Sequence, residues 1–403
     1  MNTMDSSTNS IAARETYASL FLRFLRFGLL AWGGPIAQIA MIRQELVDEE
    51  KWISNDRFKR VLGVYQALPG PEAHEMCVYF GMTARGRLGG VLAGLGFMLP
   101  GFFFMFLLSW LYLAYGEAFP QFRSVFLALQ AAVGALIIRA IHRIGSHTLT
   151  DPYLWAIAGM AVLAEAIKTP FPVTLVILGV AYLLFKERRL IPAWLISFFF
   201  VIGVVLSWQY IGSANTGGVT TTAREVATRA ATLPDLFLSG FKSGLLTFGG
   251  AYTVIAFLQH DAVEAQAWMT NAQFLDGLAL SGIIPAPLII FATFVGFFAG
   301  GGLGAIAMTV AIFLPAFGFT LIGHNFLEKA IANERLRGFL DGVTAAVVGL
   351  MAVTTFNLLQ TGITSWRSLG IFAVALAAVY LWKAKLAIAF IMAGSGIIGY
   401  FVF

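Results

Sequence analysis

A short motif that occurs twice decides the fold: residues 66–71 read Gln-Ala-Leu-Pro-Gly-Pro, and residues 282–287 read Gly-Ile-Ile-Pro-Ala-Pro. Each motif lies inside a long apolar stretch. Two prolines separated by one residue forbid a continuous helix, because each removes a backbone N–H and clashes with the preceding turn. The carbonyl groups freed in this way cannot face lipid, so each break must face protein or a water-filled cavity. A plain loop or a mechanical kink is the alternative interpretation.

The composition around the motifs is that of a membrane protein. Of the 403 residues, 59% are hydrophobic and only 12% are charged, with a mean hydropathy of +0.80. Soluble domains carry roughly 25% charged residues, so a soluble enzyme, a disordered protein and a nucleic-acid binder are excluded as first interpretations. We expect an all-α integral membrane protein with about thirteen spans. The apolar stretches, several of them short, are 18–42, 58–84, 88–115, 122–141, 153–168, 171–185, 190–211, 233–258, 273–299, 303–323, 338–360, 368–382 and 386–403.

The chain repeats itself. Residues 28–71 align with residues 244–287 at a constant offset, with 14 of 44 positions identical. We therefore predict a tandem duplication of helical bundles with Gly- and Pro-broken helices: residues 1–189 form the first repeat, 190–232 a linker span and loop, and 233–403 the second repeat. Because the linker adds one crossing, the second half is expected upside down relative to the first, as in many secondary transporters. A parallel repeat is the alternative, if one short stretch does not span.

The distribution of Lys and Arg predicts the orientation, because cytoplasmic loops are enriched in both. With the N-terminus inside, most basic loops fall on the inner side, while the outer turns at 116–120 and 300–302 carry no Lys or Arg. The basic connection 41–60 opposes this scheme, as do Arg224, Arg229 and Arg367. The inner-loop residues are Arg85, Arg87, Arg139, Arg143, Lys186, Arg188, Arg189, Lys329, Arg335, Arg337, Lys383 and Lys385.

A second pair of matched motifs opens the halves: Trp32-Gly33-Gly34-Pro35 and Phe248-Gly249-Gly250-Ala251. Adjacent glycines weaken a helix and let other groups approach its backbone. Matched breaks of this kind are the best sequence pointer to a transport site, although small residues also promote close helix packing.

We expect both pairs of breaks to converge near the midplane and to bind an anion through free backbone N–H groups and helix N-termini. The substrate-binding candidates are Gly33, Gly34, Pro69, Gly70, Pro71, Gly249, Gly250, Pro285, Ala286 and Pro287.

Ionisable residues inside the apolar stretches are further candidates. Arg26 and Lys242 occupy matched positions and could supply positive charge to an anion path, with snorkelling to the interface as the alternative. Glu72, His74 and Glu75 follow the first Pro-Gly-Pro motif and are candidates for proton coupling, although a carboxylate there could simply cap a helix. The sequence shows no metal-ligand spacing, no cofactor motif and a single cysteine, Cys77.

The matched motifs resemble the chromate ion transporter family. Both halves carry the aromatic-Gly-Gly element, a Trp-x-Ser/Thr element, the Pro-x-Pro element and a later Gly-x-Leu-Gly element at Gly86–Gly89 and Gly301–Gly304. The resemblance implies a multi-pass protein of the bacterial plasma membrane that confers chromate resistance by exporting chromate with the proton-motive force. Trp32, Ala251, Ala286 and the charged run at 72–75 depart from the family pattern and put the substrate in question.

Several hypotheses follow for function. A secondary transporter exporting chromate leads, and sulfate or another oxyanion is the second substrate class. A passive anion channel is a different mechanism on the same architecture. A membrane enzyme such as a chromate reductase is disfavoured by the lone thiol and the missing redox motifs, and no ATP-binding loop is present. The expected partners are the oxyanion, protons and the lipid bilayer, without nucleic acid; the sequence leaves a homodimer open.

Overall fold

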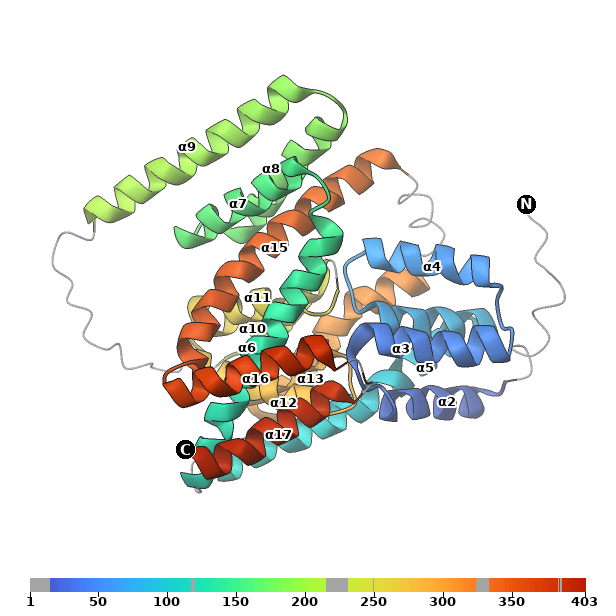
Figure 1. The fold of residues 1–403 in the computed structure, drawn as a ribbon. Coiled ribbons are helices and arrows are strands. Elements are labelled where there is room, and N and C mark those ends of the chain that lie inside the picture. The colour runs from blue at the N-terminus through green and yellow to red at the C-terminus, as the bar shows by residue number, and fades with distance from the viewer. Residues whose placement is uncertain are drawn as a thin grey trace.

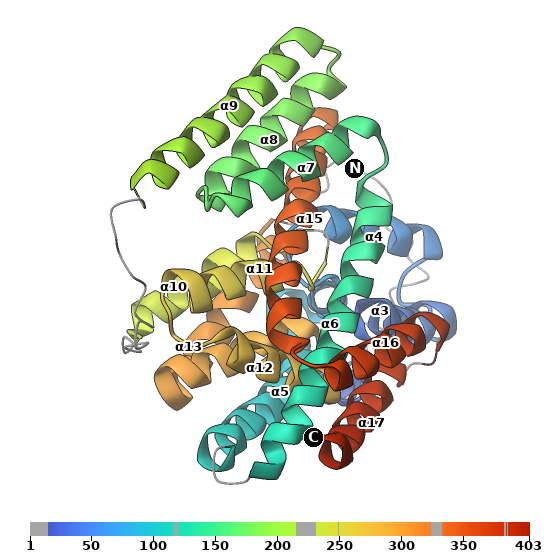
Figure 2. The ribbon, with the colours of Figure 1, turned by 60° about the vertical axis from the view of Figure 1, so that its left-hand side comes forward.

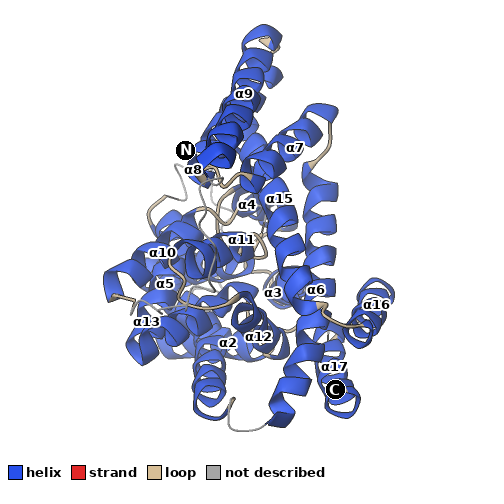
Figure 3. Ribbon diagram, turned by 90° about the vertical axis from the view of Figure 1, so that its left-hand side faces the viewer, coloured by secondary structure: helices blue, strands red, loops and turns tan. Residues whose placement is uncertain are grey.

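The computed structural model describes residues 15–116, 120–214, 231–248, 250–323, 333–382, 384 and 386–403. Within these ranges every regular element is a helix, as Figure 3 shows. Four helical segments are long and apolar enough to cross a membrane, namely Glu72–Tyr115, Phe122–Thr148, Leu288–Leu321 and Glu334–Gly362. The expected all-α class is therefore observed, and the protein is a multi-pass membrane protein.

The first half begins with a broken helix. Helix α2 (Tyr17–Leu29) starts at a capping box in which Thr16 and Ser19 satisfy each other's backbone N–H. Gly33 and Gly34 then take positive φ values of 85° and 77°, which end the helical path at low cost only because neither residue carries a Cβ. Helix α3 (Gly34–Arg43) follows and runs directly into a π-helix, η1 (Gln44–Glu49).

The Pro-Gly-Pro motif separates two further helices. Helix α4 (Asn55–Ala67) is capped by Ser54 and ends before Leu68, which is extended. Helix α5 (Glu72–Tyr115) starts directly after Pro71. The expected interruption of the helix at the Pro-Gly-Pro motif is thus observed.

Helix α5 is a hairpin of two helical arms rather than one rod. Arg85 and Gly86 leave the helical conformation, with Gly86 at a φ of 64°. A Cβ placed on Gly81 would lie against the carbonyl oxygen of Gly89 and 2.5 Å from the Cβ of Ala93. Residues 81 and 93 would stand about 18 Å apart on a straight helix, so the arms must run back along each other.

The rest of the first half is a set of four helices. They are α6 (Pro120–Thr148), α7 (Pro152–Ala166), α8 (Phe171–Lys186) and α9 (Leu190–Ala214). Helix α6 continues past the predicted stretch 122–141, so Arg139 and Arg143 belong to a helix; the prediction that they lie in an inner loop is wrong. Residues 139–148 are all helical, because this part of the chain contains no proline that would end the helix.

Apart from α9, the second half repeats this order of elements, including the π-helix and the kinked hairpin. The hairpin bends at Gly300 and Gly301, whose φ and ψ values nearly equal those of Arg85 and Gly86. The elements are α10 (Leu233–Leu245), α11 (Val254–Gln259), η2 (His260–Ala265), α12 (Asn271–Ile283), the 3-10 turn η3 (Leu288–Ile290), α13 (Phe291–Leu321), α15 (Glu334–Gly362), α16 (Trp366–Leu381) and α17 (Ala387–Val402).

The two halves interlock. Helices α7 and α8 of the first half pack against α15 of the second, and α16 and α17 of the second half pack against α6 of the first. Figures 1 and 2 show α7, α8 and α9 grouped along one end of α15, with α16 and α17 beside α6. The long helices α6 and α15 also contact each other. The packing of α7 and α8 on α15 thus mirrors the packing of α16 and α17 on α6, and these contacts hold the two halves together.

Candidate functional site

The proline breaks of both halves are buried. Residues 68–71 and 284–287 are all buried, so neither break lies in bulk solvent. The backbone N–H of Gly70 donates a hydrogen bond of 3.0 Å to the carbonyl oxygen of Thr247, which follows α10 in the second half. The carbonyl of Thr247, just beyond the end of α10, is thereby satisfied by the N–H of Gly70 in the proline break of the first half.

The glycine break of the first half is satisfied locally. The buried side chain of Gln38 donates from Nε2 to the carbonyl oxygen of Ala31 at 2.9 Å. This contact replaces the intrahelical bond that the turn at Gly33 and Gly34 removes. The carbonyl of Ala31, which the break leaves without an intrahelical partner, is therefore satisfied by a side chain of the following helix.

Two adjoining cavities, of about 720 Å³ and 220 Å³, lie where the two glycine breaks and the first proline break approach α6. Both are lined by Ile36 at the start of α3, by Ala140 and Arg143 of α6, and by Tyr252 of the second glycine loop. The larger cavity also reaches α15. Its other lining residues are Pro35, Gln66, Glu72, Ile144, His147, Thr148, Thr150, Leu154, Gly250, Ala251, Arg337, Leu340, Asp341 and Thr344.

Positive charge dominates the α6 wall of these cavities. Arg139, Arg143 and His147 follow one another at intervals of four residues, so they lie on one face of the helix. The Arg139 guanidinium donates a hydrogen bond to the carbonyl oxygen of Val379 near the end of α16. The Arg143 guanidinium makes no ion pair or hydrogen bond with any residue the structure describes. An unpaired guanidinium in a cavity is suited to bind an oxyanion through paired N–H donors.

Sequence reasoning missed these two arginines as site residues. The i, i+4, i+8 spacing of Arg139, Arg143 and His147 was the available signal, because it marks one helical face. It was hidden by their position at the end of an apolar stretch, where basic residues ordinarily indicate a cytoplasmic loop.

Several predicted site residues gather at the cavities. Gly33 lines the smaller one, and Gly250 and Glu72 line the larger one. A Cβ on Gly34 would lie 3.4 Å from the Tyr252 hydroxyl, which brings the glycine loops of the two halves side by side. Pro69, Gly70 and Pro71 directly precede Glu72 and are buried behind it.

The second proline break is placed differently. Pro285, Ala286 and Pro287 do not line either cavity; the Cβ of Ala286 lies 2.6 Å from the position of a Cβ on Gly101, in the second arm of α5. Gly249 lies outside the described residues.

Arg26 and Lys242 each face a carboxylate at matched places in the two halves. Arg26 pairs with Glu45, and Lys242 Nζ lies 4.0 Å from the Asp261 carboxylate. Glu45 and Asp261 belong to the two π-helices, η1 and η2. Arg23 adds contacts to Glu45 and Glu50 at the first of these corners. Neither Arg26 nor Lys242 lines the two cavities.

His74 and Glu75 are fully buried beneath the cavity residue Glu72. The His74 ring packs on Phe313 and Phe317 of α13, with centroids 4.8 Å and 4.7 Å away. The Glu75 carboxylate lies against Gly70 and has no hydrogen-bond partner among the residues described. A buried carboxylate without a partner is costly as an anion, which keeps Glu75 of interest for proton binding.

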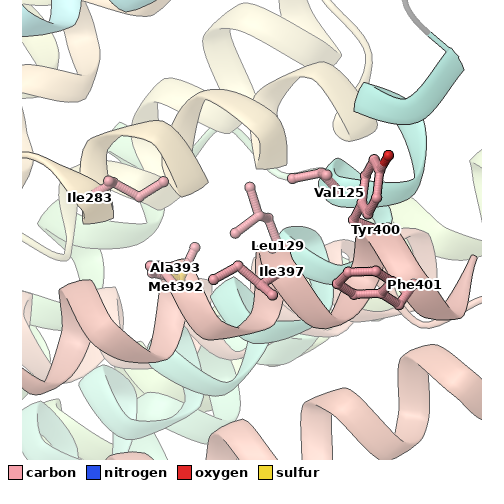
Figure 4. A pocket seen from close by; sticks show the side chains of 9 residues that line it. Val125, Leu129, Ile283, Met392, Ala393, Ile397, Tyr400 and Phe401 are labelled. Carbon is pink, nitrogen blue, oxygen red and sulfur yellow. The ribbon is translucent and has the colours of Figure 1, made fainter.

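Two other features do not suit an oxyanion. A pocket of about 410 Å³ between α6, α17 and the end of α12 is lined by apolar side chains and the ring of Tyr400, as Figure 4 shows. Glu165, His260 and Glu264 bring potential metal ligands within 4.8 Å of one another, a cluster that sequence spacing did not indicate. The Lys168 ammonium, 3.8 Å from Glu264, balances part of its negative charge.

Comparison with known proteins finds a family model and full-length relatives that carry descriptions of chromate transport. The family model described as chromate transporter matches residues 18–204 and 234–400. A chromate transport protein of Pseudomonas aeruginosa is 51% identical over 99% of this chain and 95% of its own length. A chromate transport protein of Cupriavidus metallidurans is 28% identical over 98% of this chain and 96% of its own.

No solved structure matches the chain. The family match covers most of the sequence, and the relatives named above are transport proteins rather than enzymes. Matched breaks, apolar helices and full-length relatives thus agree, and the chain belongs to the chromate transporter family.

Proposed function

We propose that this protein is a secondary active transporter that exports chromate from the cytoplasm across the bacterial inner membrane, coupled to the proton-motive force. The observation that carries the proposal is the unpaired Arg143 guanidinium, which lines both the smaller cavity beside Gly33 and the larger cavity beside Gly250 and Glu72. Family membership supports chromate as the substrate. Sulfate, or another oxyanion of similar charge and shape, is the alternative substrate, carried by a transporter or a channel.

The substrate would sit between α6 and the start of α3. The positive end of the α3 dipole and the Arg143 guanidinium would face the dianion from two sides. Arg139 would act from the smaller cavity, and Arg26 and Lys242 would contribute only through the longer-range potential. The breaks would supply the turn that lets backbone N–H groups approach.

The position of the cavity mouth supports export. The larger cavity extends to residues at the end of α6 and the start of α15, including Thr148, Arg337 and Asp341. Basic residues of this region fall on the inner side in the positive-inside scheme. We infer that the cavity opens to the cytoplasm, where an exporter takes up its substrate. The same scheme underlies our proposal that residues 1–189 and 233–403 form inverted repeats joined by 190–232.

Proton coupling would involve Glu72, His74 or Glu75. Glu72 lines the cavity, and Glu75 lies one turn further along α5. If one of these groups binds a proton more tightly in one state of the cavity, either empty or oxyanion-bound, oxyanion transport is linked to the proton gradient.

The test is flux into proteoliposomes that contain the purified full-length protein. Chromate and sulfate uptake are measured with and without an imposed pH gradient and membrane potential. Saturable flux that responds to the gradient supports a transporter, whereas non-saturating flux without counter-transport indicates a channel. Flux equal to that of empty liposomes for both anions would refute the proposal.

The broken helix is tested by the double substitution Pro69→Ala with Pro71→Ala. Restored backbone N–H groups would let α4 and α5 join, and flux should fall at least tenfold. Pro152→Ala is the matched control, because Pro152 is the first residue of α7, where proline breaks nothing. Normal flux in the double variant would remove the break from the site.

A further inference from the structure

Glu72 places a negative charge inside the candidate substrate cavity. It is the first residue of α5 and stands directly after Pro71, at the positive end of the helix dipole. Its Oε1 atom lies 3.5 Å from the position of a Cβ on Gly250, so the carboxylate projects toward the glycine loop of the other half. The opposite oxygen, Oε2, is buried and has no hydrogen-bond partner in the described part of the chain.

Among the described residues, charged and titratable groups reach this carboxylate from its own helix, where Glu75 lies one turn on, and from three other elements. Arg143 and His147 face the cavity from α6, Arg337 and Asp341 from α15, and Tyr252 from the second glycine loop. Asp341 is held by Lys186 at 2.8 Å, which balances its charge. The Arg143 guanidinium lines the same cavity as Glu72 and brings positive charge to it from α6.

We propose that Glu72 is the resident anion of the cavity and competes with the oxyanion for Arg143. In the empty protein the ionised Glu72 carboxylate balances the Arg143 guanidinium. A bound dianion needs the same guanidinium, and a third negative charge in the same cavity is unfavourable because like charges repel. A proton therefore binds Glu72 when the oxyanion binds, and leaves when the oxyanion leaves. The inference rests on the proposed function and adds the sign of its proton linkage.

The sign has a consequence for the energy source. Proton and oxyanion binding strengthen each other, so the two travel together rather than in exchange. One proton carried together with one dianion gives a transported charge of minus one. An inside-negative membrane potential drives that charge outward. The electrical part of the proton-motive force then powers export.

The experiment measures sulfate and chromate binding to the full-length protein in nanodiscs across a pH series. Sulfate stays doubly negative throughout, so its affinity reports the protein's titration. Wild-type affinity should rise as the pH falls, by up to about tenfold per pH unit. Glu72→Gln should bind tightly at every pH, because its neutral amide mimics the protonated acid. For chromate, comparing variant and wild type at each pH cancels the titration of the anion itself.

Two control variants separate Glu72 from other groups. A histidine that binds a proton together with the oxyanion would give a pH dependence of the same sign as Glu72 does. If Glu72 is responsible, His147→Gln should keep the wild-type pH dependence. Glu49→Gln changes an exposed carboxylate on η1 and should match wild type. Charge moved per sulfate, from reversal potentials in proteoliposomes, should rise from about one in wild type to about two in Glu72→Gln.

The outcomes are distinct. If Glu72→Gln keeps the wild-type pH dependence, or loses affinity at every pH, the competition is wrong while the proposed function stands. If the pH dependence disappears in His147→Gln instead, the linkage belongs to that histidine. If wild type binds neither anion at any pH, both the linkage and the proposed function fail.

Discussion

The backbone N–H of Gly70 donates to the carbonyl oxygen of Thr247 at 3.0 Å, which joins the proline break of one half to the end of α10 in the other. Each partner belongs to a helix end that its own half leaves unsatisfied. The two halves thus complete each other's backbone hydrogen bonding two and three residues before Glu72 and Gly250, which line the larger cavity. Changes at this contact should affect folding and binding together.

Gly70→Ala should destabilise the protein. Gly70 has a φ of 152°, and a Cβ there would lie 2.9 Å from a Glu75 carboxylate oxygen. Strain and crowding of this kind cost about 1 to 3 kcal/mol. The melting temperature in detergent should fall. Gly63→Ala is the matched control, since a Cβ at Gly63 meets nothing within 4 Å in the helix α4; it should be neutral or stabilising. Equal melting temperatures for both variants would contradict the prediction.

Arg143→Gln should weaken oxyanion binding. The change removes a cavity-lining α6 guanidinium that has no partner among the described residues, while the shorter glutamine keeps a hydrogen-bonding amide. Loss of a charged hydrogen bond worth about 1.5 to 3 kcal/mol raises Kd roughly 10- to 100-fold. Binding of sulfate or chromate by calorimetry checks this.

The control for Arg143 is Arg87→Gln, an exposed residue beside the turn of α5. Its Kd should equal that of wild type. A Kd unchanged in Arg143→Gln would place the oxyanion elsewhere.

Arg26→Gln and Lys242→Gln should change stability more than affinity. Each side chain is about half exposed and pairs with a carboxylate of a π-helix. Exposed pairs contribute up to about 1 kcal/mol, so the melting temperature should fall slightly, and Kd should shift less than in Arg143→Gln. A larger loss of affinity than in Arg143→Gln would instead make these residues direct ligands. The paired variants Glu45→Gln and Asp261→Asn, combined in double-mutant cycles, isolate the coupling energy.

Gly81→Ala and Gly296→Ala should open the two hairpins. In both halves a Cβ at this position would press on the carbonyl oxygen of the facing glycine, Gly89 or Gly304. Overpacking costs about 1 to 3 kcal/mol, and yield of folded protein and melting temperature should drop for both. Gly159→Ala, where a Cβ meets nothing within 4 Å in α7, is the control and should not lower either. Tolerance of both hairpin variants would mean that the arms do not pack through their glycines.

Local sequence determined the helices and their breaks. The low content of charged residues predicted a membrane protein. The Pro-Gly-Pro and Gly-Gly motifs end helices where they occur, because proline and glycine act through the backbone of their own residue. The duplication was equally visible, since matched residues recur at a fixed offset. Those features depend on neighbours along the chain and need no knowledge of the packing.

Only the tertiary structure decided which charges face the site. Arg26 and Lys242 have the pattern of site residues, but each meets a carboxylate that follows it by nineteen positions in its own half. Arg143 has the pattern of a loop signal, but it lines the cavity with Glu72 and Gly250. The partner of a charged side chain is set by contacts between segments distant in sequence, and here by the exchange of helices between the halves, which no local pattern encodes.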